Sequence, residues 1–133
     1  MEIHQREKEG IAILDLNGRL VVGAPASALR SAIDKLLAAG TTKVILNLED
    51  VDYIDSTGLG TMVICFTSLQ KASGGLKLLN LNKRNLELLV LTKLSTVFEL
   101  FTDEQDAVNS FFPNREIKRF DILSFIQQQE QES

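Results

Sequence analysis

Residues 47–60 read Asn-Leu-Glu-Asp-Val-Asp-Tyr-Ile-Asp-Ser-Thr-Gly-Leu-Gly and join two segments of different pattern. The segment before, residues 43–48, is rich in branched apolar side chains, which predicts a central strand of a sheet. From Leu59 onward, apolar side chains return at three- and four-residue steps, which predicts a helix that stops at Gly74 and Gly75. The quoted stretch therefore leads from a strand, through a turn, into a helix.

The predicted helix has one apolar stripe and one smooth face. At about 100° per residue, the buried stripe consists of Leu59, Met62, Val63, Phe66 and Leu69. The opposite face consists of Thr57, Gly60, Thr61, Ile64, Ser68 and Lys71. A solvated helix normally carries Glu and Lys on its outer face, so this almost uncharged face favours a docking surface. The alternative is an ordinary surface, because single exposed apolar residues are common.

The turn itself offers a candidate modification site. Asp55, Ser56 and Thr57 are residue types that cap helices, because their short side chains accept from unpaired first-turn amides. Gly58 and Gly60 keep the turn low and leave the Ser56 hydroxyl uncovered. A phosphate there would lie near the positive end of the helix dipole. The two interpretations are a phosphorylated docking site and a helix cap without further function.

Strands and helices alternate along the rest of the chain. Strands are predicted over residues 2–8, 11–16, 43–48, 76–81 and 97–100, with Gly18 ending the second and a short extended piece at 20–22. Helices are predicted from Pro25 to a stop at Gly40, and over residues 59–73, 83–92 and 103–111. This order predicts an α/β fold: a mixed sheet of four to five strands, with parallel neighbours after an N-terminal hairpin, and about four helices.

The chain length of 133 residues suits one domain, predicted over residues 1–112, with residues 113–133 as a C-terminal extension. The extension has no clear period, and a terminal helix is expected from about Asp121. Its apolar side chains are Ile117, Phe120, Ile122, Leu123, Phe125 and Ile126. Such surface needs cover on this domain or on a neighbouring molecule, which makes residues 113–133 a candidate contact for a homo-oligomer.

Composition and charge exclude several classes of protein. The net charge is -4 and no basic run occurs, which argues against a nucleic-acid partner. The longest apolar run is far shorter than the roughly 20 residues of a membrane span, and the first residues lack a signal-peptide pattern. Cys65 is the single cysteine, so no internal disulfide forms, and it is interpreted as a small buried side chain. A cytoplasmic location is expected.

Enzyme chemistry is not predicted. A serine hydrolase needs a base beside its nucleophile, and the only histidine is His4, on the first predicted strand. Neither a Gly-x-Ser-x-Gly elbow nor a phosphate-binding loop occurs. Asp50, Asp52 and Asp55 fit one solvated side of an extended segment better than a metal site. No catalytic residue, cofactor or metal is therefore expected.

The turn Asp55-Ser56-Thr57-Gly58-Leu59-Gly60 resembles the signature of the STAS family, the sulfate transporters and anti-sigma factor antagonists. The resemblance covers roughly residues 2–110 and extends to the order of strands and helices. It implies an anti-sigma factor antagonist that binds an anti-sigma factor with serine kinase activity. Phosphorylation of Ser56, with Thr57 as second choice, would weaken the complex, and a serine phosphatase would reset it. The partner-binding residues expected from the signature and the helix face are Asp55, Ser56, Thr57, Gly58, Gly60, Thr61 and Ile64.

The sequence departs from the family pattern in one place. Many antagonists carry an acid within a Gly-Glu-Leu-Asp-like segment near the phosphoacceptor, whereas this chain has Gly18-Arg19-Leu20-Val21. Val21 in place of the acid removes any help that the acid gives to phosphotransfer. Two alternatives remain open: a STAS module of a stressosome-like scaffold or lipid-transport accessory complex, and an oligomerisation domain with a vestigial phosphosite.

Overall fold

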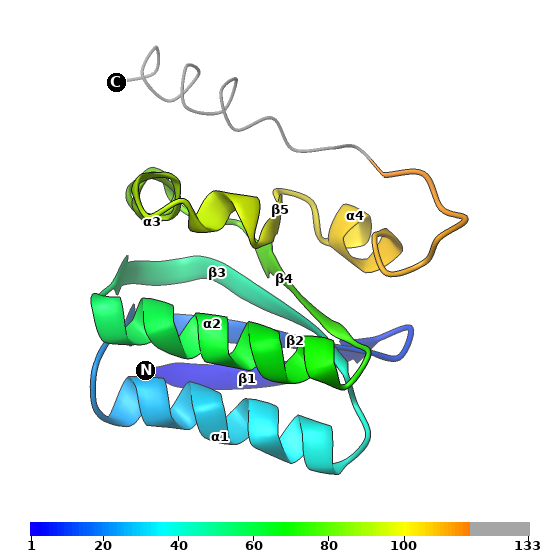
Figure 1. Cartoon of the computed structure of the whole chain (residues 1–133), viewed down its shortest axis with the longest axis horizontal. Helices are drawn as coiled ribbons and strands as arrows, with labels where there is room; N and C mark the ends of the chain where they lie inside the picture. The colour runs from blue at the N-terminus through cyan, green and yellow to red at the C-terminus, as the bar shows by residue number, and fades with distance from the viewer. Residues whose placement is uncertain (118–133) are drawn as a thin grey trace.

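A computed structural model describes residues 1–117, which form a five-stranded sheet with helices against both faces (Figure 1). The strands lie in chain order: β1 (Glu2–Lys8), β2 (Ile11–Leu20), β3 (Lys43–Ile54), β4 (Gly75–Leu79) and β5 (Glu99–Phe101). β1 pairs antiparallel with β2, and every later pair is parallel. The predicted mixed α/β sheet is confirmed.

The helices connect the parallel strands and follow β5. They are α1 (Ala24–Ala38), α2 (Ser56–Lys71), α3 (Lys83–Leu91) and α4 (Glu104–Asn109), with a 3₁₀ turn, η1 (Leu94–Thr96), after α3. Figure 1 shows α1 and α2 running side by side along one face of the sheet. No helix within residues 1–117 is long and apolar enough to cross a membrane.

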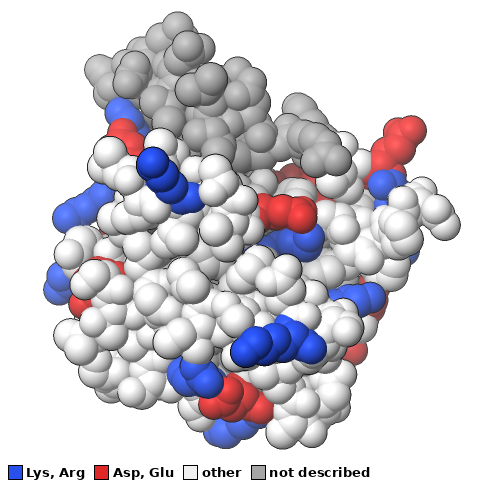
Figure 2. Space-filling view, viewed as in Figure 1, with Lys and Arg blue, Asp and Glu red and all other residues white. Residues whose placement is uncertain are grey.

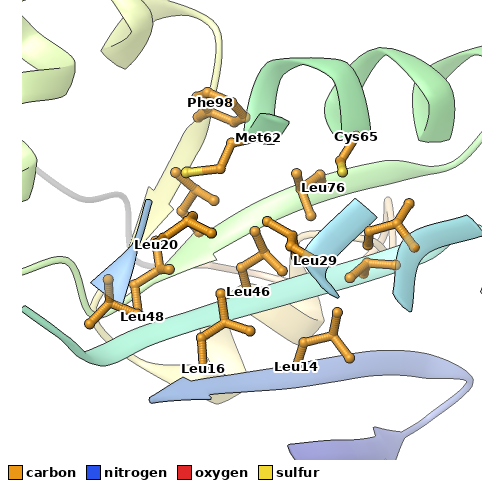
Figure 3. Close-up of a cluster of buried hydrophobic side chains, with 14 of the residues drawn as sticks. Leu14, Leu16, Leu20, Leu29, Leu46, Leu48, Met62, Cys65, Leu76 and Phe98 are labelled. Carbon is orange, nitrogen blue, oxygen red and sulfur yellow. The ribbon is translucent and has the colours of Figure 1, made fainter. Parts of the chain in front are cut away.

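The core has two parts because side chains alternate between the two faces of each strand. On the larger side, Leu14 and Leu16 of β2 and Leu46 and Leu48 of β3 face α1, α2 and α3. In Figure 3 these leucines point to one side of the sheet, where Leu29 of α1 and Met62 of α2 belong to the same buried cluster. The smaller side consists of Ile11, Ile13, Ile45, Leu79 and Phe101, covered by Ala107 and Val108 of α4. A sheet covered on both faces explains why β3 begins with a nearly continuous apolar run.

Two predicted strand ends are wrong, and both lie next to the start of α2. β2 does not end at Gly18 but continues to Leu20, so the separate extended piece at residues 20–22 does not exist. Gly18 has a φ of 123° and lies at a shift in the β2–β3 register, so it forms a bulge rather than a stop. β3 continues beyond the predicted residue 48 because Arg19 and Leu20 pair with Tyr53 and Ile54.

The remaining predicted bounds differ by a few residues. β4 ends at Leu79 because Asn80 adopts a left-handed φ of 60°, which turns the chain out of the sheet. β5 begins at Glu99 rather than residue 97, and α4 ends at Asn109 rather than residue 111. The terminal helix predicted from about Asp121 lies outside the described residues.

Candidate functional site

Asp55 joins two loops at the carboxyl edge of the sheet. As the N-cap of α2, its Oδ1 accepts from the Gly58 amide at 2.7 Å. Its Oδ2 accepts from the Val22 amide at 3.0 Å, and its own amide donates to the Leu20 carbonyl at 3.2 Å. The hydrogen bonds from Gly58 and Val22 lower the pKa of Asp55, because they stabilise the carboxylate. The carboxylate therefore ties the loop before α1 to the first turn of α2.

Ser56 is the first residue of α2, and both it and Thr57 are exposed. The structure thus presents the Ser56 side chain at a helix start, as the sequence predicts. Amides of a first helical turn have no carbonyl partner within the helix, so this end carries partial positive charge. A negatively charged group attached to Ser56 would be stabilised by this partial positive charge.

The two glycines of the turn differ, although the sequence predicts the same role for both. Gly58 is buried, and a Cβ atom there would overlap the Leu20 carbonyl oxygen. Gly58 thus allows α2 to begin directly against the end of β2, and placing it on an accessible docking surface is wrong. A Cβ atom at Gly60 would meet nothing within 4 Å, and Gly60 is exposed.

The outer face of α2 has the predicted smooth character. Lys71 is the only charged residue of the helix, and Figure 2 shows few charged side chains over α2. Ile64 is 48% exposed and Thr61 is half-buried. The predicted buried stripe needs one correction: Cys65 is fully buried, whereas Val63 and Phe66 are only partly buried.

A shallow groove of about 560 Å³ follows this face between α1 and α2. Thr57 and Thr61 line it from α2, Ala26 and Ser27 from α1, and Val22 from the loop before α1. Val22 is 65% exposed, in the loop that the Asp55 carboxylate holds. No local sequence pattern singles out Val22, because the position of its loop depends on a hydrogen bond to a residue 33 positions away.

A second hollow, of about 330 Å³, lies on the other side of Ser56, between the start of α2 and α3. Tyr53, Ser56, Arg84 and Leu91 are among the residues that line it. Leu91 is 81% exposed. The Cζ atoms of Arg84 and Arg19 lie 4.7 Å and 5.3 Å from the centroid of the Tyr53 ring. No local sequence pattern reveals this group, because its members come from β2, β3 and α3.

The residues considered for enzyme or metal chemistry do not converge on Ser56. His4 is exposed on β1 and shares a hollow with Asp15 and Asp50, not with Ser56. Within residues 1–117, no group of three or more His, Cys, Asp and Glu side chains is arranged to hold a metal ion. Asp50 and Asp52 are exposed on β3, while the carboxylate of Asp55 caps α2 by accepting from the Gly58 amide.

Comparison with known proteins finds a relative in sequence and two neighbours in fold. The anti-sigma-B factor antagonist of Bacillus subtilis is 39% identical over 61 residues, which are 46% of this chain and 56% of that protein. The aligned region thus spans just over half the length of that relative. The crystal structure of TM1081 from Thermotoga maritima has a TM-score of 0.77 at 25% identity and covers 82% of this chain and 93% of that one. An anti-sigma factor antagonist from Mycobacterium paratuberculosis has a TM-score of 0.71 at 21% identity, over 83% and 92%.

A family model also matches most of this chain. The sequence model of the STAS domain matches residues 2–107, which span β1 to most of α4. The same residues carry the Asp55–Gly60 turn and the sheet that positions it. The chain therefore belongs to the STAS domain family.

Proposed function

We propose that this protein is an anti-sigma factor antagonist that works by partner switching. With Ser56 unmodified, it binds an anti-sigma factor that is also a serine kinase, and phosphorylation of Ser56 releases it. The observation that carries the proposal is the exposed Ser56 at the start of α2, next to a helix face with almost no charge. The names of the Bacillus and Mycobacterium proteins, both anti-sigma factor antagonists, agree with it.

The proposed binding surface surrounds Ser56. Val22, Thr57, Gly60, Thr61 and Ile64 are its members, and all are at least partly exposed. Small and apolar side chains lose little hydration when a partner covers them, so this surface is well suited to bind a protein. Asp55 contributes indirectly, because its hydrogen bonds position Val22 relative to the helix.

Phosphorylation would change this surface and leave the core intact. In the transfer, the serine oxygen bonds to the γ-phosphorus of ATP while the bridging bond to the β-phosphate breaks, ADP leaves and the hydroxyl proton is released. The product carries an added charge of about -1.5 to -2. Burying that charge in an uncharged interface costs free energy, which weakens the complex. The anti-sigma factor antagonist SpoIIAA has a similar fold, and its structure is known in the unphosphorylated and in the phosphorylated form.

The departure at Val21 concerns how the phosphate is added. Val21 lies in the loop next to Val22, and Asp55, the acid beside Ser56, already accepts two amide hydrogen bonds. The phosphotransfer step would then depend on groups of the kinase. A serine phosphatase would return the protein to its binding state in the cytoplasm, the expected compartment.

A second candidate is an interaction module that does not use Ser56. Val90 and Leu91 of α3 and Val97 after η1 are exposed apolar residues. They favour an additional contact, as a scaffold, a transport accessory or an oligomerisation domain would need.

Incubation with the anti-sigma factor kinase of the same organism and ATP, followed by mass spectrometry, separates these functions. The proposal predicts the mass gain of one phosphoryl group, located on Ser56. Self-association without any modification would support the second candidate and contradict the first. Ser56→Ala is the matched control, because it removes only an exposed hydroxyl.

A further inference from the structure

Two arginines from different elements contact Tyr53, and Tyr53 lines the hollow that Ser56 borders. Arg84 of α3 lines the same 330 Å³ hollow as Ser56 and lies 4.7 Å from the centroid of the Tyr53 ring. Arg19 of β2 lies 5.3 Å from the same centroid. Contact with an aromatic face restricts a guanidinium, so both cations are held near the start of α2 before any ligand arrives.

Neither arginine is neutralised by a carboxylate in the part of the chain that the structure describes. The salt bridges found within residues 1–117 involve other cations, namely Arg6, Lys8, Arg30, Lys77 and Arg115. The acidic residues that line the hollow are Asp55 and Glu87. Asp55 already accepts from two amides, so Glu87 is the main acidic competitor for Arg84.

The charge of Arg19 reaches the start of α2. The pKa of Asp55 is lowered chiefly by the amides of Gly58 and Val22, and the positive charge of Arg19 contributes in the same direction. Ser56 is the next residue. A phosphate on Ser56 would be the strongest anion in this region, with oxygens that match the bidentate geometry of guanidinium groups.

We propose that Arg84 and Arg19 bind the phosphate of phosphorylated Ser56 and draw it back over the hollow between α2 and α3. This inference rests on the proposed function, in which Ser56 is the phosphoacceptor. In this arrangement the modification does more than add charge. It also engages Arg84 and Arg19 on the side of Ser56 that faces α3, while the negative charge that remains still borders the docking surface on α2.

The test is the ionisation of the phosphate itself. The protein is made with phosphoserine incorporated at residue 56 during translation, and phosphorus NMR follows its second ionisation, near pH 6 for a free phosphoserine. Nearby cations favour the dianion, so Arg84→Gln should raise the phosphate pKa by roughly half a pH unit. Arg19→Gln should raise it as well. Glu87→Gln should lower it, because a competing negative charge is removed.

Lys83→Gln is the matched control. It removes one positive charge from the residue next to Arg84, on the same helix, but Lys83 does not line the hollow. Circular dichroism checks that each variant stays folded, which is expected because Arg19 and Arg84 are exposed. A shift for Arg84→Gln no larger than for Lys83→Gln overturns the proposal. No kinase takes part, so a failure of partner phosphorylation would contradict the proposed function and leave this result standing.

Discussion

The carboxylate of Asp55 accepts a hydrogen bond of 3.0 Å from the backbone amide of Val22, which lies 33 residues earlier in the chain. Its other oxygen caps α2 through the Gly58 amide. One side chain therefore sets the position of the β2–α1 loop relative to the helix that begins with Ser56. This arrangement makes the proposed docking surface a property of the fold, because its loop and its helix are held together.

Asp55→Ala should destabilise the protein, because it removes a helix cap and leaves two amides without their partner. The expected loss in Tm is roughly 3–6 °C for a domain of this size. Asp55→Asn should lower Tm by less, because its carboxamide oxygen can still accept a hydrogen bond from the Gly58 amide. Thermal melts followed by circular dichroism give the order. Equal Tm values for Asp55→Ala and the wild type would show that the cap contributes nothing.

The Asp55 contribution should depend on pH. Its folded-state pKa lies below the usual value because Gly58 and Val22 donate to the carboxylate. Its contribution to stability is therefore complete above the unfolded pKa, about 3.9, and is lost as pH falls through the lower folded value. The difference in Tm between wild type and Asp55→Asn should shrink below about pH 4. A difference that stays constant down to the lowest pH at which both proteins refold would contradict this.

Gly58 and Gly60 form a matched pair on α2. Gly58→Ala should cost about 1–3 kcal/mol, because the new methyl group would overlap the Leu20 carbonyl oxygen. Gly60→Ala should stabilise by about 0.5–1 kcal/mol, because the position is open and alanine favours the helix. Urea unfolding of both variants measures the difference. Effects of the same sign for both alanines would contradict the close contact at Gly58 and the open space at Gly60.

Ile64→Glu should weaken partner binding at least tenfold, about 1.4 kcal/mol, because it puts a charge into the uncharged face of α2. The fold should persist, since Ile64 is 48% exposed. Gln70→Glu is the control, because Gln70 is exposed on the same helix outside the proposed surface. Calorimetric titration of the anti-sigma factor with each variant is the measurement. Similar losses for both variants would show that added charge alone, and not the position of Ile64, affects binding.

Much of the fold could be predicted from local pattern. β1 has its predicted bounds, and α1 begins near Pro25, because hairpin and helix-start signals are local. The exposure of Ser56 at a helix start also follows from the order of residue types around it. The glycines are harder to interpret from the sequence alone. Gly18 looks like a stop and is a bulge, because pairing with β3 continues on both sides of it.

The surroundings of Ser56 depend on contacts that sequence spacing does not contain. Tyr53 lies next to Arg19 because β2 and β3 pair in one particular register, and next to Arg84 because α3 returns to the same edge. The burial of Gly58 likewise depends on how closely α2 approaches Leu20. Such relations arise only after strands and helices pack.

The most direct test compares the affinity of the anti-sigma factor for the unmodified protein, for Ser56→Ala and for the protein carrying phosphoserine at residue 56, all by calorimetry. The first two should bind alike, and the phosphoserine protein should bind at least tenfold more weakly, with unchanged circular dichroism. Equal affinity for the phosphorylated and unmodified proteins would show that Ser56 does not control this surface.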